Sequence, residues 1–205
     1  MPYFEYGKKE IEYLKKKDKR LAVAIERIGK VEREVMPDLF EALVNAIVGQ
    51  QVSMKAQATI WQRMKEGIGE ITPETILGIE PEELKAYGIS MRKVSYIRDA
   101  AENIVSGRLD LEKLENMGDE EVCKILSGLR GVGVWTAEML MLFSMQRPDV
   151  FSYGDLAIRR GLCMLHHHKE MPKERFERYR KRYSPYGSTV SLYLWAIAGG
   201  SPFEE

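Results

Sequence analysis

The sequence predicts an all-α fold, and three kinds of observation support that prediction. Apolar residues in the first thirty positions recur at near-helical spacing, as at Ile11 and Leu14. Proline at a helix start and glycine at a helix end delimit segments in the middle of the chain, for example Pro73 and Gly78. No stretch alternates apolar and polar residues over the length of a strand. We therefore expect nearly all of the 205 residues to lie in helices or in the short turns between them.

In the first half of the chain, two helices are expected from periodicity alone, and each later one begins at a proline or just after a side chain that accepts hydrogen bonds from the first N–H groups of the helix. In order, these are two charged helices within 5–30, one from Pro37 to about Val48, one from Met54 to about Lys65 capped by Ser53, two short helices starting at Pro73 and Pro81, and one that Ser90 caps and that runs to about Val105.

In the second half the same signals continue. The expected helices are one over 120–127 capped by Asp119, one opening near Val134, one from Asp155 to about Leu165, one from Lys173 to about Tyr183, and one over 186–198 that Ser184-Pro185 caps and starts. We expect one unit of two lobes, with about 1–50 joining 151–205 in one lobe and about 51–150 forming the other. With 44% hydrophobic residues, the chain can bury one sizeable core or two small helical ones.

The composition bears on partners and location. The chain has 31 Lys and Arg against 31 Asp and Glu, so its formal net charge is zero and the positive field at any nucleic-acid surface must be local. No apolar run reaches the length of a membrane helix, and the N-terminus lacks the pattern of a signal peptide. We therefore expect no membrane partner and a cytoplasmic (nucleoid) or nuclear location rather than secretion.

The sequence offers no metal site. Cys123 and Cys163 lie in apolar helical patterns and are expected to be core thiols rather than a disulfide. The three histidines at 166–168 are adjacent, so on a helix their side chains point in different directions and make a poor ligand set. Their expected role is positive charge at a helix C-terminus.

The segment 126–137 reads as a helix, a tight glycine hairpin and a second helix. Gly131 and Gly133 permit a positive φ, and the hairpin presents N–H groups at the start of the helix near Val134, where an anion such as phosphate is attracted. A plain turn between packed helices is the alternative interpretation. The residues expected to contact phosphate are Arg130, Gly131, Val132, Gly133, Val134 and Thr136.

Two further features sit around this hairpin. Thr136, Ala137 and the apolar run 139–143 follow it, and Asp155 comes about twenty residues later. Together they resemble the helix-hairpin-helix DNA glycosylase superfamily, in its 3-methyladenine DNA glycosylase II branch, with the motif at about 120–146 and without the N-terminal β lobe. The resemblance implies double-stranded DNA with damaged bases as the partner, and a central cleft between the lobes that holds a flipped-out base. We expect the protein to be a monomer.

Asp155 falls where the superfamily carries its catalytic aspartate. A carboxylate beside C1′ stabilises the positive charge that the sugar develops as the base leaves, and it can orient or deprotonate the attacking water. The alternative is an ordinary helix N-cap that pairs with Arg159 one turn on. The two roles are compatible.

The resemblance also assigns a base pocket. Members that cut the strand carry at position 135 a lysine that forms a Schiff base, whereas this chain has Trp135, which cannot. Trp195 matches the family's second pocket tryptophan, and Tyr153 is a further candidate for the cleft wall. An electron-rich ring attracts a base that alkylation has made cationic. A core position is the alternative for either tryptophan, and the motif favours the pocket more strongly for Trp135 than for Trp195.

The segment Gln50-Gln51-Val52-Ser53 matches the family's loop that enters the minor groove. Gln51 occupies the position that fills the gap left by the extruded nucleotide, with Gln50 beside it, although such residues are usually apolar. An exposed polar turn is the alternative.

The expected function is therefore a monofunctional DNA glycosylase that hydrolyses the N-glycosidic bond of alkylated purines, such as 3-methyladenine and 7-methylguanine, and leaves an abasic site. Alternatives are a glycosylase for an oxidised or deaminated base, such as 8-oxoguanine or hypoxanthine, and a non-catalytic DNA-binding module. We expect no required cofactor. Two cysteines cannot hold a four-cysteine iron–sulfur cluster, while the resemblance suggests a monovalent cation between hairpin and phosphate.

Overall fold

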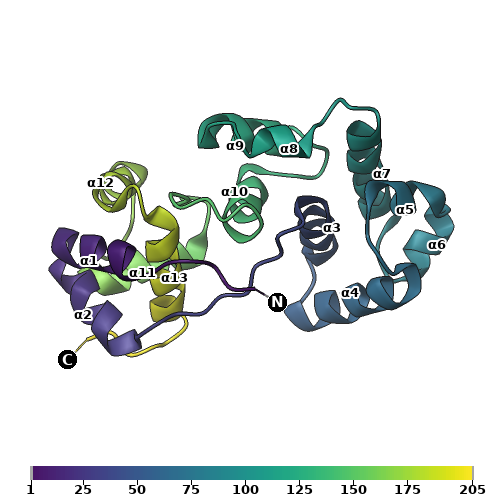
Figure 1. The fold of residues 1–205 in the computed structure, drawn as a ribbon. Coiled ribbons are helices and arrows are strands. Elements are labelled where there is room, and N and C mark those ends of the chain that lie inside the picture. The colour runs from purple at the N-terminus through teal and green to yellow at the C-terminus, as the bar shows by residue number, and fades with distance from the viewer. Residues whose placement is uncertain (1, 205) are drawn as a thin grey trace. The chain divides into compact units, whose positions relative to one another are not determined.

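The computed structural model describes residues 2–204, and within them it confirms the all-α prediction (Figure 1). Thirteen α-helices lie in this part of the chain, and its only strand-like pairing is an isolated bridge between Tyr3 and Glu34. Within the same residues, no helix has the length and apolar character needed to cross a membrane.

The helices are short and follow one another closely (Figure 1). They are α1 (Lys8–Lys17), α2 (Lys19–Ile28), α3 (Leu39–Gly49), α4 (Met54–Ile68), α5 (Pro73–Gly78), α6 (Pro81–Ala86), α7 (Met91–Val105), α8 (Leu111–Leu114), α9 (Asp119–Ser127), α10 (Val134–Phe143), α11 (Leu156–His166), α12 (Lys173–Tyr183) and α13 (Gly187–Ala198).

Several predicted helix starts are confirmed by their caps. The Ser53 side chain accepts from the N–H of Ala56, and the Ser90 side chain accepts from the N–H of Lys93. Such bonds satisfy N–H groups that have no partner within the helix.

Other boundaries differ from the predictions. Pro37 precedes α3 rather than opening it, because Asp38 is the N-cap and accepts from the N–H of Glu41. Asp119 is the first residue of α9, after Gly118, rather than its cap. The side-chain hydroxyl of Ser184 donates to the Asp149 carboxylate instead of capping α13. The short helix α8 was not expected, although its N-cap Asp110 is an ordinary start signal.

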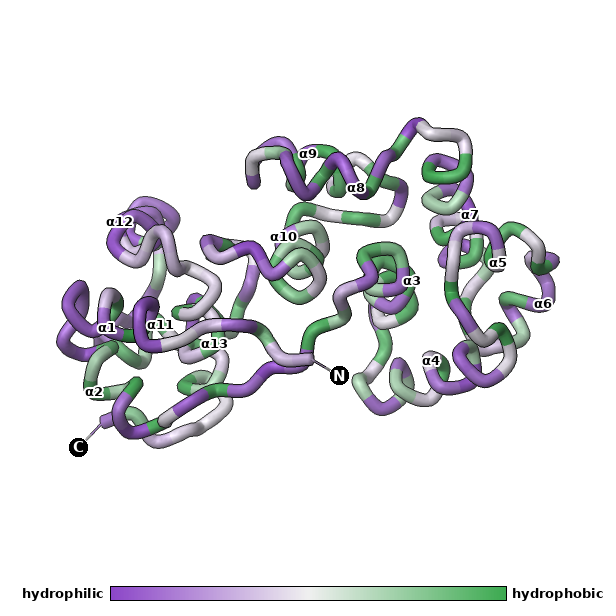
Figure 2. The backbone as a smooth tube through the Cα atoms, viewed as in Figure 1, coloured by the Kyte–Doolittle hydropathy of each residue, from purple (hydrophilic) through white to green (hydrophobic). Residues whose placement is uncertain are grey.

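The chain divides into two compact units, Met1–Val35 with Met141–Glu205 and Met36–Leu140. The expected lobes had boundaries near 50 and 150. Helix α3 falls in the second unit because its apolar residues pack against α4 and α7, which belong to that unit. Figure 2 shows α3 as one of the more hydrophobic helices of the chain. The central cleft stays a prediction.

In the first unit, α11 and α13 form the most closely packed pair of helices. A side chain at Gly161 of α11 would run into the backbone of Leu194 on α13, so glycine is needed at this crossing. Helix α13 is buried over nearly its whole length, as expected for a helix without a polar face. By contrast, α12 is strongly hydrophilic (Figure 2) and buries only one stripe of aromatic residues.

The same unit contains a buried polar cluster that the sequence did not reveal. Asp18 caps α2 and also accepts hydrogen bonds from Arg182 Nη1 at 2.8 Å and from Tyr183 OH at 3.0 Å. His166 Nε2 lies 3.0 Å from the Tyr183 oxygen. Since that hydroxyl donates to Asp18, His166 Nε2 is the donor to Tyr183.

The predicted role of the histidines was wrong for His166. Burial lowers the pKa of His166 to about 4, with the Asp18 carboxylate opposing that shift, so this side chain is neutral near pH 7. Burial also lowers the pKa of His168, whose ring bonds to Tyr179 OH at 2.8 Å. Periodicity could not reveal this, because burial at these positions comes from α12 packing over them.

Candidate functional site

Asp155 is the N-cap of α11. Its Oδ1 accepts a hydrogen bond from the backbone N–H of Ile158 at 2.9 Å and a second one from Trp195 Nε1 at 3.1 Å. The residue is 7% exposed. The capping role expected from the sequence is therefore present, and a tryptophan from α13 fixes the same carboxylate. Two donors on one oxygen restrict how the carboxylate can rotate.

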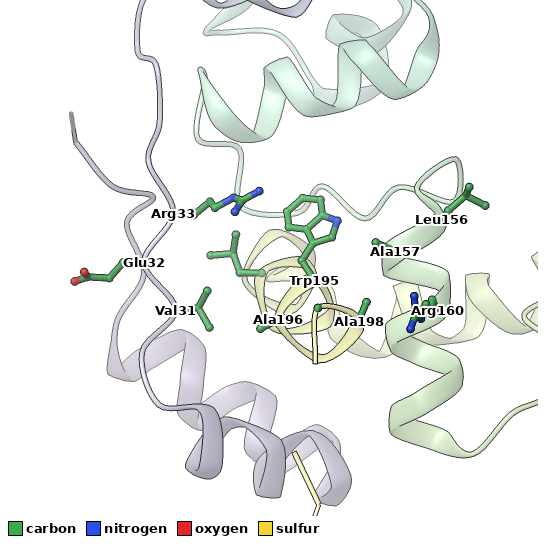
Figure 3. A pocket seen from close by; sticks show the side chains of 11 residues that line it. Val31, Glu32, Arg33, Leu156, Ala157, Arg160, Trp195, Ala196 and Ala198 are labelled. Atoms are coloured by element: carbon green, nitrogen blue, oxygen red, sulfur yellow. The ribbon is translucent and has the colours of Figure 1, made fainter. Parts of the chain in front are cut away.

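Trp195 sits between Asp155 and an aromatic neighbour. Its ring stacks on Phe143, with centroids 5.4 Å apart and planes inclined at 25°. The Arg33 guanidinium in turn lies 5.9 Å from the centre of the Phe143 ring. In Figure 3 the indole nitrogen of Trp195 lies on the side of Leu156 and Ala157, the residues that follow Asp155.

A pocket of about 540 Å³ opens beside this tryptophan. Its wall is mainly apolar, with charged residues from two segments (Figure 3). The lining residues are Val31, Glu32, Arg33, Leu156, Ala157, Arg160, Leu192, Trp195, Ala196, Ala198 and Gly199. A concave, mostly apolar site with a few polar groups is the usual form of a small-ligand pocket.

Tyr153 does not line this pocket. It packs edge-on against Phe176, with centroids 5.2 Å apart, and the Arg159 guanidinium lies 5.0 Å from the centre of its ring. It belongs to the aromatic core of the first unit. Its place at the wall of a cleft stays a prediction.

The hairpin in the second unit lies between α9 and α10. Gly131 has φ of +80°, as predicted, and a side chain there would collide with the ring of Tyr96. Gly133 does not have a positive φ, and a Cβ there would meet open space, so only the first glycine is required by backbone conformation. Arg130 Nη1 lies 3.8 Å from Asp99, an ion pair on the surface.

The other predicted phosphate contacts divide into two groups. Val132 and Thr136 are buried, so that side of the hairpin offers backbone rather than side chains. Val134 begins α10 and is exposed. The next residue, Trp135, which was predicted for the base pocket, is 49% exposed. The first N–H groups of a helix lack partners within it and carry the positive end of the helix dipole. The geometry therefore suits an anion at this end of α10.

The loop before α4 is joined to the hairpin. Gln50 Nε2 donates to the carbonyl oxygen of Gly131 at 2.7 Å, a contact between residues 81 positions apart. Gln51 is exposed and adopts φ of +56°, in the left-handed region that non-glycine residues rarely enter. Ser53 caps α4, so its hydroxyl has a structural role.

Lys93, on α7, belongs to this site, although it was not among the residues predicted for it. Its Nζ donates to the carbonyl oxygens of Val48 and Gln50, at 2.8 and 2.7 Å. Burial lowers the pKa of Lys93. The sequence marks Lys93 only as an exposed base in the first turn of a helix, so no local signal identifies its partners. Arg98, five residues further along α7, likewise donates to the carbonyl oxygens of Ile76 and Ile79.

The structure thus gathers two groups of predicted residues. Asp155 and Trp195 meet in the first unit, while Gln50, Gln51 and the Gly131 turn meet in the second. Residues 2–204 contain no cluster of three or more His, Cys, Asp or Glu residues arranged for a metal ion.

Known proteins resemble this chain in sequence and in fold. Residues 44–185 match the family described as HhH-GPD superfamily base excision DNA repair protein. The chain is 34% identical over 161 residues to DNA-3-methyladenine glycosylase 1 of Schizosaccharomyces pombe. The aligned region covers 76% of this chain and 71% of that relative.

Two solved structures agree with this assignment. A DNA-3-methyladenine glycosidase from Bacillus halodurans superposes with a TM-score of 0.87 at 37% identity, over 98% of this chain and 94% of that one. The 3-methyladenine DNA glycosylase of S. pombe in complex with abasic DNA gives 0.80 at 30% identity, over 92% of this chain and 95% of that one. Since the matched family spans more than half of its residues, the chain belongs to the HhH-GPD superfamily of base excision DNA repair proteins.

Proposed function

We propose that this protein is a DNA glycosylase that hydrolyses the N-glycosidic bond of flipped-out alkylated purines and leaves an abasic site. The observation that carries the proposal is the hydrogen bond from Trp195 Nε1 to Asp155, which joins the candidate catalytic carboxylate to the wall of an apolar pocket. Relatives and structural neighbours named 3-methyladenine glycosylases support the substrate class.

Asp155 acts on the sugar. As the C1′–N bond breaks, its electron pair leaves with the base and C1′ becomes an oxocarbenium-like cation. Water then adds its oxygen to C1′ and loses a proton, for which the Asp155 carboxylate is the base. Opposite unit charges about 4 Å apart at an effective dielectric near 20 attract by roughly 4 kcal/mol. That energy corresponds to about three orders of magnitude in rate.

An alkylated purine needs little further help to leave. Methylation at N3 or N7 makes the base cationic, so it departs neutral without a proton from a general acid. The electron-rich face of an indole attracts such a base by cation–π interaction, and Trp195 offers an indole at the pocket. Extrusion from the duplex costs least for damaged, weakly paired bases. We therefore expect broad selectivity among alkylated purines.

Position 135 sets the reaction type. A tryptophan has no amine that attacks C1′, so no Schiff base forms there and the strand is left uncut. The proposed enzyme is monofunctional.

The α9–α10 hairpin binds the backbone of double-stranded DNA. The N–H groups at the start of α10 bind a phosphate, and the formal net charge of zero implies few additional phosphate contacts. A monovalent cation between turn carbonyls and that phosphate is part of the proposal: the Leu129 and Gly131 oxygens each accept one internal hydrogen bond and keep a second lone pair. We also propose a monomer that acts in the nucleoid or nucleus.

A panel of duplexes with single lesions, incubated with and without borohydride, tests the proposal. We expect release of 3-methyladenine and 7-methylguanine and no borohydride-trapped adduct. Faster release of 8-oxoguanine or hypoxanthine would show that the substrate is an oxidised or deaminated base and not an alkylated purine. A trapped adduct would contradict the proposal that no Schiff base forms at Trp135. Binding without turnover on any lesion would leave only a DNA-binding module.

A further inference from the structure

We propose that Gln50 and Lys93 are positioning residues that hold Gln51 ready for insertion into DNA and fix it to the phosphate-binding hairpin. This inference rests on the proposed function and goes beyond it, because it assigns different roles to the two adjacent glutamines. All the contacts that carry it lie within the unit Met36–Leu140.

The Gln50 side chain already has a hydrogen-bond partner within the protein. Its Nε2 donates to the Gly131 carbonyl oxygen at 2.7 Å, which is a short N–H···O distance. Residue 50 is also the C-cap of α3, with an extended backbone and its own N–H donated to Ile47. A side chain bound to the hairpin in this way is not the one that fills a gap in a DNA duplex.

Lys93 holds the other end of the same residue. Its Nζ donates to the Gln50 carbonyl oxygen and to that of Val48, the carbonyl end of α3, where a cation is favourable. Residue 50 is thus held through its carbonyl by α7 and through its side chain by the hairpin.

Gln51 is the next residue, and the contacts of Gln50 hold it at the surface. Its φ of +56° turns the chain sharply between the end of α3 and the cap of α4. It is exposed, and its side chain makes no hydrogen bond within residues 2–204. On the other side of the turn, a side chain at Gly49 would collide with Gln57, so the loop is packed against α4 as well. An amide both donates and accepts, which suits pairing with a base that has lost its partner.

The Gln50 bond couples the Gln51 loop to the hairpin. The Gly131 carbonyl belongs to the turn whose following N–H groups are proposed to bind phosphate, so the hairpin and the Gln51 loop form one braced element. Binding of the phosphate then sets how deeply Gln51 reaches into the duplex. Loss of the Gln50 bond leaves phosphate binding intact and impairs insertion.

The test is a double-mutant cycle on Gln50→Glu and Gln51→Ala. The first change is isosteric and removes the N–H donor that faces Gly131. The readout is the ratio of affinities for a duplex with a tetrahydrofuran abasic site and for the intact duplex, so it needs no turnover. Gln62→Glu is the matched control, because it makes the same change on exposed α4, where Gln62 bonds only to Glu66 at 2.7 Å.

We expect each single variant to lower the affinity ratio about tenfold and the double variant to lower it no further, since coupled residues are not additive. Gln50→Lys, which restores a donor of similar reach, is expected to recover most of the ratio. Lys93→Met is expected to match Gln50→Glu, with its melting temperature measured alongside.

Three results would overturn the proposal. The double variant could lower the affinity ratio by about a hundredfold, so that the two losses add. Alternatively, the ratio for Gln50→Glu could equal that for Gln62→Glu, or the ratio for Gln51→Ala could equal that of the wild type. A wild-type protein that prefers the abasic duplex but releases no base would instead refute the proposed function and leave this inference standing.

Discussion

The indole N–H of Trp195 donates to Oδ1 of Asp155 at 3.1 Å, across 40 residues of sequence. The bond depends on the packing of α11 and α13, because Gly161 lets α11 meet the backbone of Leu194, the residue next to Trp195. Core packing therefore determines where the carboxylate lies. Trp195 also lines the pocket, so one side chain connects the candidate acid–base group to the candidate base-binding wall.

Trp195→Phe tests this connection. Phenylalanine keeps an aromatic ring against Phe143 and removes the N–H that faces Asp155. A hydrogen bond to a charged group contributes about 1.5–3 kcal/mol, so we expect kcat for 7-methylguanine release to fall about tenfold or more while KM changes less than threefold. Trp61→Phe, a half-buried tryptophan of the other unit, is the control. An unchanged kcat, or a change confined to KM, would show that Trp195 does not act through Asp155.

Gly131→Ala and Gly133→Ala separate the two glycines of the hairpin. The first change places a methyl group on the Tyr96 ring at a residue with φ of +80°, and we expect the free energy of unfolding to fall by about 1–3 kcal/mol. The second places it in open space, and we expect a change within about 0.5 kcal/mol. Urea unfolding measures both. Equal destabilisation by the two variants would refute the assignment of the tight turn to Gly131.

Stability is expected to fall in acid through His166. Burial lowers its folded pKa to about 4, below an ordinary value of 6.5, so the unfolded chain binds a proton between these pH values and the folded chain does not. The contribution of His166 to stability is full above about pH 6.5 and is lost as pH falls toward 4, by about 2–3 kcal/mol. Unfolding in urea at pH 4.5, 5.5 and 7 measures this slope.

The matched variants for this prediction are His166→Asn and His167→Asn. The first removes the buried titrating ring, and its slope between pH 4.5 and 7 is expected to be clearly smaller. The second alters an exposed histidine in the left-handed conformation that asparagine tolerates, and it is expected to keep the wild-type slope. If both variants lost the pH dependence of stability, burial of His166 would not be its specific cause.

The sequence predicted the features that are set locally. Ser53 and Ser90 cap their helices because a cap needs only a side-chain oxygen three residues before an N–H group. Asp155 was found by its distance from the hairpin, and its capping bond is present. The order of helices followed from the same kind of signal.

Long-range contacts could not be read from the sequence. The Gln50 bond to Gly131 and the Lys93 bonds to α3 join segments 43 to 81 residues apart, and no residue pattern encodes such pairs. The sequence therefore left open which glutamine fills a gap in DNA. His166 was misread for the same reason, because α12 determines its burial.

The most direct test of the central claim is single-turnover release of 7-methylguanine and 3-methyladenine from methylated duplex DNA by Asp155→Asn. Asparagine keeps an oxygen for the Ile158 and Trp195 donors, so fold and pocket are preserved while the negative charge is lost. Asp38→Asn makes the same change at the N-cap of α3 and is the control. We predict a fall in rate of about a thousandfold with the Kd for DNA within threefold of wild type, whereas the control keeps its rate. Release by Asp155→Asn at the wild-type rate would contradict the account.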